Sequence, residues 1–309
     1  MIDQSRQMNV LVLGATGFVG RHTTPLLVDA GWQVTCLTRS ESSAKVVREM
    51  GADSVHGDLD DAASLERAFE EVNCRVMLCI ASLGFGHAPT IIGAAQRAGI
   101  DRAVFVSTTA IFTGLNAPTK SVRIAAEDAI ASSNLDFTIV RPTMIYGAHD
   151  DRNIARLIAA LSSTAVFPIP GGGRRLQQPI HVDDVATALV QVLGTPGLSR
   201  ESFNVAGPEA MTFRSLVSRV AAAMGKRRLL VPVPLAPIIG LVRLYEHLSR
   251  HPRIKAEQFE RLSEDKVFDN APAIDAFGFS PRSFDTGIRQ EIADISRHKS
   301  VGPPVSREQ

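Results

Sequence analysis

Three glycines spaced three residues apart, Gly14, Gly17 and Gly20, follow a run of apolar residues at 10–13. A glycine-rich turn that leaves a strand and opens a helix directs backbone N–H groups at one point, where the positive end of the helix favours a phosphate. Gly14 permits a tight turn, Gly17 lets a pyrophosphate approach the backbone, and Gly20 lets the helix pack closely on the sheet. A ligand-free connection is the alternative, but the flanking strand and helix favour a dinucleotide site. The residues expected to hold the dinucleotide here are Gly14, Thr16, Gly17, Phe18, Val19 and Gly20.

The end of the next strand, expected at 33–38, bears on the choice between NAD and NADP. An acidic residue at this position usually holds the ribose hydroxyls of NAD, whereas an arginine accommodates the 2′-phosphate of NADP. The chain has Arg39 here and no carboxylate before Glu41. We therefore expect NADP, bound by Arg39, with NAD as the alternative. A solvated arginine at a strand end is the other explanation of this residue.

Two further strand ends carry residues suited to the rest of the cofactor. Asp58 and Leu59 follow a short strand at 54–56, where the carboxylate can accept the adenine amino group. Ala81 and Ser82 follow the strand expected at 75–80, and such small residues leave room for ribose and diphosphate. Both pairs are therefore assigned to the cofactor site.

These residues are positioned by a regular alternation of short apolar segments and amphipathic helices. Strands alternating with helices at this spacing predict an α/β fold, a Rossmann-type doubly wound parallel sheet with a smaller C-terminal substrate lobe. We expect the cofactor domain in 1–165, completed near 180–206, and the lobe in 166–180 and 207–299. Residues 300–309 are expected to form a disordered tail.

Composition narrows the possible partners. The 309 residues carry 33 Lys and Arg against 32 Asp and Glu, so a net charge of +1 gives no argument for nucleic-acid binding. The three cysteines lack metal-ligand spacing and suggest reduced thiols in a cytoplasmic protein. The most apolar run, 229–242, contains three prolines and is too short for a transmembrane segment. We expect this run to pack inside the second lobe rather than to touch a membrane surface.

Taken in order, the motifs resemble the extended and atypical short-chain dehydrogenase/reductase superfamily, in its NAD(P)-dependent epimerase/dehydratase-like branch. The resemblance implies that a Ser or Thr among Ser107, Thr108 and Thr109 orients a substrate oxygen. It also implies that Pro142, Thr143 and Met144 lie beside the nicotinamide. The segments that carry the resemblance are 14–20, 57–59, 104–108, 139–147, 181–186 and 203–207.

The chain departs from that family at its acid–base pair, a Tyr followed four residues later by a Lys. Its two tyrosines, Tyr146 and Tyr245, are followed at that spacing by Asp150 and Ser249. Aligning 126–127 with the family puts Thr119 at the tyrosine position and Arg123 at the lysine position. A threonine hydroxyl is too weak an acid to replace a phenol, and Arg123 cannot shuttle protons, although it can bind the nicotinamide ribose.

Three functions remain open. The first is an NADP-linked oxidoreductase for a small carbonyl or alcohol, with Lys120 or Tyr146 as proton donor. The second is a cofactor-binding sensor or assembly subunit without turnover. The third is a nucleotide-sugar epimerase or dehydratase, although Gln177 stands where that group usually has a diphosphate-binding arginine and only Arg174 and Arg175 lie near.

Metal binding and oligomer formation receive little support from the sequence. The histidines His22, His87 and His181 show no metal-like clustering. Asp183 and Asp184 are better explained as helix-capping residues than as a catalytic pair. The helices expected at 88–98 and 122–132 can either pair in a homodimer or cover the sheet.

Overall fold

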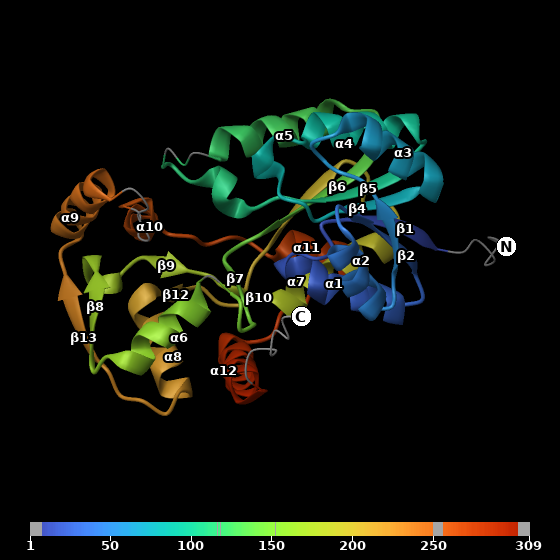
Figure 1. The fold of residues 1–309 in the computed structure, drawn as a ribbon. Coiled ribbons are helices and arrows are strands. Elements are labelled where there is room, and N and C mark those ends of the chain that lie inside the picture. Colours follow the sequence, from blue (N-terminus) through green and yellow to red (C-terminus); the bar gives the residue numbers. More distant parts are fainter. Residues whose placement is uncertain (1–7, 116, 118, 152, 250–255, 302–309) are drawn as a thin grey trace. The chain divides into compact units, whose positions relative to one another are not determined.

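The computed structural model describes residues 8–301, except 116, 118, 152 and 250–255 (Figure 1). The chain divides into two compact units. The first unit comprises Met1–Thr143, Val182–Val205 and Asp269–Ser280, and the second comprises Met144–His181, Ala206–Phe268 and Pro281–Gln309. This division differs from the expected one because 144–165 belongs to the second unit and 269–280 belongs to the first.

A seven-stranded parallel sheet forms the centre of the first unit, with strand order β11-β6-β5-β4-β1-β2-β3. The predicted doubly wound α/β fold is confirmed. Leu13 pairs with both Leu37 and Cys79, so the loops that leave these neighbouring strands emerge at one edge. The strands are β1 (Asn9–Leu13), β2 (Gln33–Thr38), β3 (Asp53–His56), β4 (Val76–Cys79), β5 (Arg102–Val106), β6 (Asp136–Pro142) and β11 (Glu201–Val205).

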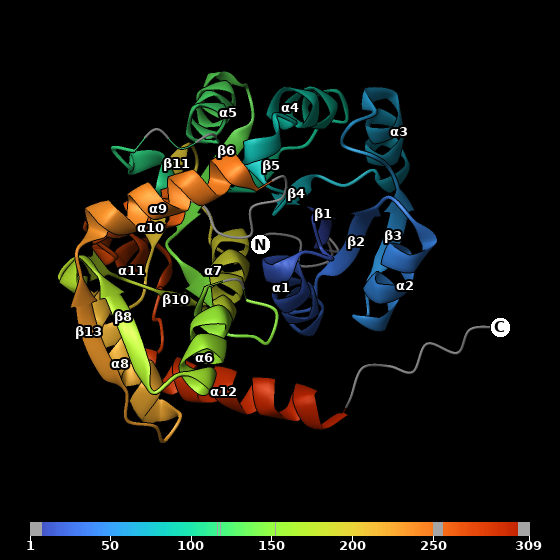
Figure 2. The same ribbon diagram turned by 60° about the vertical axis from the view of Figure 1, so that its left-hand side comes forward.

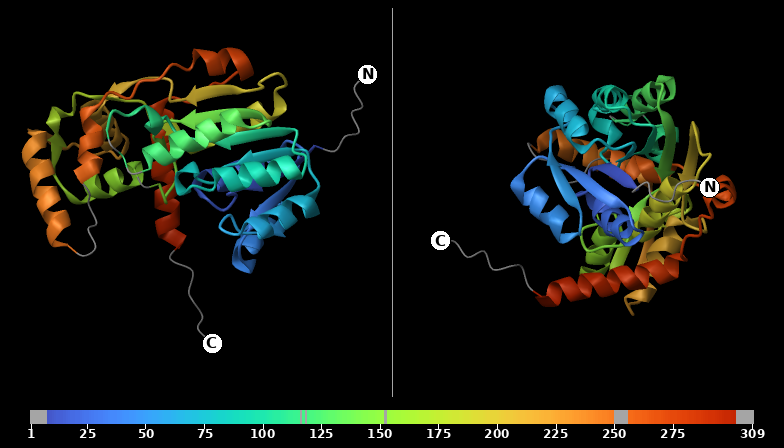
Figure 3. Two further views of the ribbon diagram at one scale, coloured as in Figure 1. Left: turned by 90° about the horizontal axis from the view of Figure 1, so that it is seen from above. Right: turned by 90° about the vertical axis from the view of Figure 1, so that its right-hand side faces the viewer.

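Helices cover both faces of this sheet. Figure 1 shows α3, α4 and α5 on one face and α1, α2 and α7 on the other, and Figure 3 (left) views the first of these layers with the strands behind it. α4 and α5 thus cover the sheet, and their pairing in a dimer stays a prediction. The helices of this unit are α1 (Phe18–Asp29), α2 (Glu41–Glu49), α3 (Ala62–Val72), α4 (Ala88–Arg97), α5 (Lys120–Ser132), α7 (Val182–Gly194) and α11 (Ala271–Phe277), with 3-10 turns η1 (Leu83–Phe85) and η2 (Thr109–Phe112).

The sheet forms because its strands are nearly continuous apolar runs, as expected for strands buried on both faces. The side chains of Val10 through Leu13 are at most 1% exposed. The three cysteines are free thiols in the same interior. Burial raises the pKa of Cys36 and of Cys79 to about 12, so both thiols stay protonated and act as small apolar side chains.

The second unit consists of helices and three two-stranded ribbons, β7–β10, β9–β12 and β8–β13. Its core includes Tyr146, Phe284 and Ile288, packed with apolar side chains of α6 and α8. Its elements are β7 (Ile145–Tyr146), α6 (Ile154–Ser163), β8 (Val166–Pro170), η3 (Gly171–Gly173), β9 (Leu176–Gln177), β10 (Ile180–His181), β12 (Met211–Thr212), α8 (Phe213–Ala223), β13 (Leu229–Val233), α9 (Leu235–Leu248), α10 (Ala256–Glu260), η4 (Arg261–Ser263) and α12 (Phe284–Val301).

One expectation about the second unit is wrong. The apolar run 229–242 was expected to pack in the interior, but α9 contains no buried residue and β13 is also exposed or half-buried along its length. A single sequence shows that a segment is apolar but not whether enough partner surface exists to cover it.

The C-terminal end also differs in part from expectation. α12 continues to Val301, so the first two residues of the predicted tail are helical, and 302–309 lie outside the described residues. None of the helices in the described part of the chain is long and apolar enough to cross a membrane.

Candidate functional site

The glycine turn between β1 and α1 is as tight as its sequence implies. Gly17 N–H donates to the Gly14 carbonyl at 3.1 Å. Gly14 has φ +90°, and a Cβ there would lie 2.7 Å from the Ala81 backbone nitrogen. A Cβ on Gly20 would lie 2.2 Å from the Gly14 carbonyl oxygen. Because these neighbours are backbone atoms that cannot easily move, positions 14 and 20 require glycine.

The start of α1 is arranged to receive an anion. Gly17 is the N-cap residue, no side chain accepts a hydrogen bond from the first turn, and that turn contains no acidic residue. A helix start in this state presents free N–H donors and the positive end of the helix dipole. Thr16 and Phe18 are half-buried beside it, and Val19 and Gly20 are buried. The turn therefore fits the pyrophosphate of a dinucleotide, since it presents N–H donors and the positive end of the helix dipole with no acidic side chain in its first turn.

The ends of β2 and β3 bring Arg39 and Asp58 to neighbouring positions at this sheet edge. Gly57 N–H donates to the Thr38 carbonyl at 3.0 Å, which ties the two strand ends together. Arg39 is exposed, so its guanidinium is available to a phosphate. Asp58 and Leu59 are half-buried, and one Asp58 carboxylate oxygen accepts from Asp60 N–H at 3.1 Å. The second Asp58 oxygen can still accept from an adenine amino group.

The loop after β4 lies directly against the glycine turn. The backbone N–H groups of Ile80 and Ala81 both donate to the Leu13 carbonyl, at 2.8 and 3.0 Å. Ser82 caps the short turn η1 by accepting from Gly84 N–H at 3.3 Å. Ala81 and Ser82, both with small side chains, therefore lie beside the glycine turn between β1 and α1.

Thr119 and Arg123, which occupy the positions of the family's acid–base pair, are hydrogen-bonded to each other. Arg123 Nη1 donates to Thr119 Oγ1 at 2.7 Å across the first turn of α5. The same guanidinium lies over Gly84, where a Cβ would approach it to 3.1 Å. Lys120 Nζ donates to the Thr113 carbonyl, so this lysine is tied to the loop after η2. The pair is well placed to contact a ligand beside the β4 loop, but it contains no acid that titrates near neutral pH.

The three hydroxyl residues after β5 have different environments. Thr108 Oγ1 caps η2 by accepting from Ala110 N–H at 3.2 Å. Thr109 Oγ1 donates to the Pro142 carbonyl at 3.3 Å, which links the exits of β5 and β6. Ser107 is buried, and its hydroxyl has no hydrogen-bond partner among the described residues. Of the three, Ser107 is the buried hydroxyl without a partner in the described part of the chain, and Thr108 keeps its O–H as an unused donor.

The segment after β6 is divided between the two units. Pro142 and Thr143 are buried in the first unit, and Thr143 N–H donates to the Val205 carbonyl at 3.1 Å. Met144 and Tyr146 belong to the second unit. Tyr146 is 1% exposed, and its ring packs against His181 and Phe284 with centroid separations of 5.3 and 5.2 Å.

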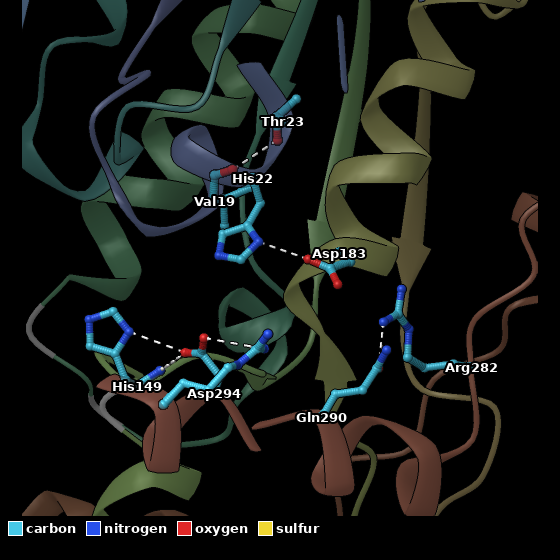
Figure 4. Close-up of polar contacts among 9 residues, drawn as sticks. Val19, His22, Thr23, His149, Asp183, Arg282, Gln290 and Asp294 are labelled. Atoms are coloured by element: carbon cyan, nitrogen blue, oxygen red, sulfur yellow. Dashed lines mark hydrogen bonds and ion pairs between the residues drawn. The ribbon is translucent and has the colours of Figure 1, made fainter. Parts of the chain in front are cut away.

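Two polar contacts of the first unit were missed in the sequence. Arg141 forms a bidentate ion pair with Glu127, with Nε 3.1 and 3.0 Å from the two carboxylate oxygens, so this arginine ties β6 to α5. His22 Nδ1 lies 2.7 Å from Asp183 Oδ1, which joins α1 to the first turn of α7 (Figure 4). Residues 161 positions apart give no local signal of contact. Asp183 and Asp184 lie in the first turn of α7, at the helix start where the sequence predicted them. Asp183 also pairs with His22.

The second unit contains a buried pair of carboxyl groups. Asp151 accepts hydrogen bonds from the backbone N–H groups of Asn153, Ile154 and Ala155 at 2.7, 2.6 and 2.9 Å, so it carries the negative charge at the start of α6. Glu291 on α12 is 0% exposed. Burial, with the adjacent Asp151 carboxylate as second cause, raises the pKa of Glu291 to about 9. Glu291 is therefore protonated at neutral pH, beside the Asp151 carboxylate.

Comparison with known proteins agrees with this geometry. The model of a family described as NAD(P)H-binding matches residues 14–196. The chain is 25% identical over 303 residues to the photosystem II assembly factor Ycf39 of Synechocystis, covering 90% of this chain and 88% of that protein. It is 28% identical over 260 residues to the ceramide reductase of Caulobacter vibrioides, covering 79% and 80%.

A solved structure extends the likeness to the fold. UDP-glucose 4-epimerase of Thermus thermophilus, in complex with NAD, superimposes with a TM-score of 0.69 over 94% of this chain and 99% of that one, at 22% identity. The family match places the chain among NAD(P)H-binding proteins and supports a nicotinamide cofactor, and the likeness to the epimerase confirms the predicted fold.

Proposed function

Because the chain belongs to the family of NAD(P)H-binding proteins, we propose that it is an oxidoreductase acting on a small carbonyl or alcohol substrate with NADP. The exposed Arg39 at the end of β2, with no acidic residue beside it in the sequence before Glu41, supports NADP over NAD. The free, buried cysteines support a reducing compartment such as the cytoplasm.

The observation that carries an enzymatic function is the unpaired Ser107 hydroxyl. A buried hydroxyl without a partner costs about 1–3 kcal/mol, and a ligand oxygen that bonds to it removes that cost. Thr109 donates its hydroxyl to Pro142 and Thr108 accepts from Ala110, so Ser107 is the candidate for a substrate oxygen, with the free O–H of Thr108 beside it in the sequence.

The roles proposed for the other residues follow from where they lie at the strand ends and on α5. The N–H groups at the start of α1 bind the pyrophosphate, Asp58 binds the adenine, and Arg123 binds the nicotinamide ribose. When bound, the cofactor supplies or accepts the hydride. Ser107 orients the carbonyl or alcohol oxygen, and Lys120 is the side chain of α5 that can supply a proton. Tyr146 is the less favoured donor because packing in the second unit accounts for its ring.

A second function has a specific observation in its favour. Thr119 and Arg123 replace the family's acid–base pair and bond to each other, as expected of a cofactor-binding sensor or assembly subunit that does not turn over. The likeness to an assembly factor supports the same alternative. The nucleotide-sugar function has less support because Arg175, a candidate diphosphate ligand, is paired with Asp265 at 3.2 Å.

The test is turnover of NADPH with a panel of aldehydes, ketones and enones, repeated for Ser107→Ala and Thr109→Val. An oxidoreductase should oxidise NADPH with at least one panel member, and Ser107→Ala should lower kcat by about 10–100-fold, as expected for a lost hydrogen bond to the reacting oxygen, without loss of thermal stability. Thr109→Val should instead lower stability, by about 1 kcal/mol, because it removes the bond to Pro142. Equal turnover by Ser107→Ala and the wild type would contradict the role of Ser107. NADPH binding without turnover of any compound would favour the sensor or subunit.

A further inference from the structure

The outward face of α9 is apolar. Leu241, Leu244 and Leu248 are 68%, 56% and 74% exposed, and Tyr245 is 40% exposed. These positions follow the spacing i, i+3, i+4 and i+7, so their side chains lie along one stripe of the helix. A helix on a protein surface normally turns such a stripe inward. In α9 the stripe faces solvent.

Another side of α9 packs against neighbouring parts of the second unit. Ile238, Ile239 and Val242 are half-buried, and α9 packs beside α10 (Figure 1). Figure 2 shows α9 as one continuous helix that follows β13. The exposed stripe is therefore an additional apolar surface, and contiguous apolar patches of this kind mark binding sites for membranes or other molecules.

Positive charge is concentrated in the same stretch of sequence. Residues 226–255 contain seven of the chain's 33 Lys and Arg but one of its 32 Asp and Glu. Lys226 Nζ and Arg228 Nε donate to the backbone carbonyls of Ser162 and Leu161, contacts that leave their charge uncompensated. Arg243 is paired with Glu260 at 2.6 Å. Three of the seven, Arg250, Arg253 and Lys255, lie outside the described residues.

We propose that α9 binds the surface of an anionic lipid membrane, with Leu241, Leu244, Tyr245 and Leu248 inserted among the acyl chains. An apolar stripe flanked by cationic residues is the combination that holds a helix in the membrane interface. The 14-residue helix is about 21 Å long at 1.5 Å per residue, which is too short to span a bilayer, so it lies in the membrane plane.

The charge distribution favours lipid over a second copy of the chain. A symmetric contact through α9 would bring the same cationic stretch of two molecules together, and like charges across an interface are unfavourable. Anionic headgroups instead neutralise this charge, with an attraction of about 1 kcal/mol for each Lys or Arg near the surface.

The experiment is sedimentation of the full chain with vesicles, at low salt, using phosphatidylcholine alone and phosphatidylcholine with 30% phosphatidylglycerol. The wild type should pellet with the anionic vesicles, and the bound fraction should fall as sodium chloride is added. Leu244→Glu with Leu248→Glu should reduce binding at least tenfold. The matched control is Val267→Glu with Ile274→Glu, which adds the same two negative charges at residues 50% and 49% exposed outside α9, and it should bind like the wild type.

Several results would overturn the proposal. These are failure of the wild type to pellet with anionic vesicles, equal pelleting with both vesicle types, or unchanged binding of the doubly substituted protein. A dimer in analytical ultracentrifugation that the double substitution converts to a monomer, without vesicle binding, would assign the stripe to self-association instead. Circular dichroism and thermal unfolding of each variant check its folding, and NADPH titration checks that the other unit, which holds the glycine turn, is unchanged.

Discussion

The two units of this protein use their polar groups differently. At the strand ends of the first unit, several donors have no partner among the residues that the structure describes: the N–H groups at the start of α1, the Arg39 guanidinium and the Ser107 hydroxyl. In the second unit, Asp151 and Glu291 form a buried carboxyl pair inside the fold, and burial raises the pKa of both. Unpaired donors at a sheet edge indicate capacity to bind a ligand, whereas a buried carboxyl pair affects stability and its dependence on pH.

The comparison predicts that changes at the strand ends of the first unit affect ligand affinity more than stability. Gly14→Ala should show the largest effect. The new Cβ would lie 2.7 Å from the Ala81 backbone in a conformation with φ +90°, so the turn must distort and lose its cradle. We expect NADPH affinity, measured by fluorescence titration, to fall about 100-fold or more, which corresponds to roughly 2.7 kcal/mol.

Gly31→Ala is the matched control for this substitution. Gly31 has a similar φ of +85°, but nothing lies within 4 Å of the added Cβ. This variant should lose about 1 kcal/mol of stability from backbone strain and bind NADPH like the wild type. Equal loss of affinity in both variants would mean that strain alone, and not the closed space at Gly14, explains the effect.

In the second unit the predicted effect is on stability and depends on pH. The pKa of Glu291 is about 9 in the folded protein and 4.5 ordinarily, so the folded state holds a proton that the unfolded chain releases above pH 4.5. The resulting stabilisation is complete below pH 4.5 and is lost as pH rises towards 9. Glu291→Gln removes the buried group that must ionise at high pH. We expect urea unfolding to show the variant more stable than the wild type at pH 9, by roughly 1–3 kcal/mol, and no more stable at pH 5.

The control for Glu291→Gln is the same change at Glu70, an exposed residue of α3. Glu70→Gln should leave the pH dependence of unfolding as in the wild type. If Glu291→Gln followed the wild-type profile as well, the buried carboxyl pair would not contribute to the pH response, and the contrast between the units would weaken.

The fold could be predicted because its signals are local. The strand at Gln33–Thr38 has the predicted bounds, and the helix predicted from Phe18 begins at that residue, since apolar runs, glycines and capping residues act within a few positions. Thr119 and Arg123 lie one helical turn apart at the start of α5, and their correspondence to the family's acid–base pair stays a prediction.

The features that could not be predicted depend on contacts between residues far apart in the sequence. Tertiary packing produces the pairing of His22 with Asp183, the burial of Glu291 beside Asp151, and the missing partner of Ser107. The exposure of α9 was likewise unpredictable, because apolar composition alone does not reveal how much surface is available to cover a helix. A helical periodicity test on 235–248 identifies the stripe but not the side of the helix that faces solvent.

The most direct test of the central claim is titration of the purified protein with NADPH and with NADH by fluorescence, alongside Arg39→Asp and the control Lys45→Asp on the neighbouring helix. Both changes alter the charge equally, but Arg39 alone is placed to contact the 2′-phosphate. We predict tighter binding of NADPH than of NADH by the wild type and by Lys45→Asp, and loss of that preference, by about tenfold or more, in Arg39→Asp. Binding of neither cofactor would contradict the assignment of the glycine turn itself, and an unchanged preference in Arg39→Asp would contradict the assignment of the 2′-phosphate.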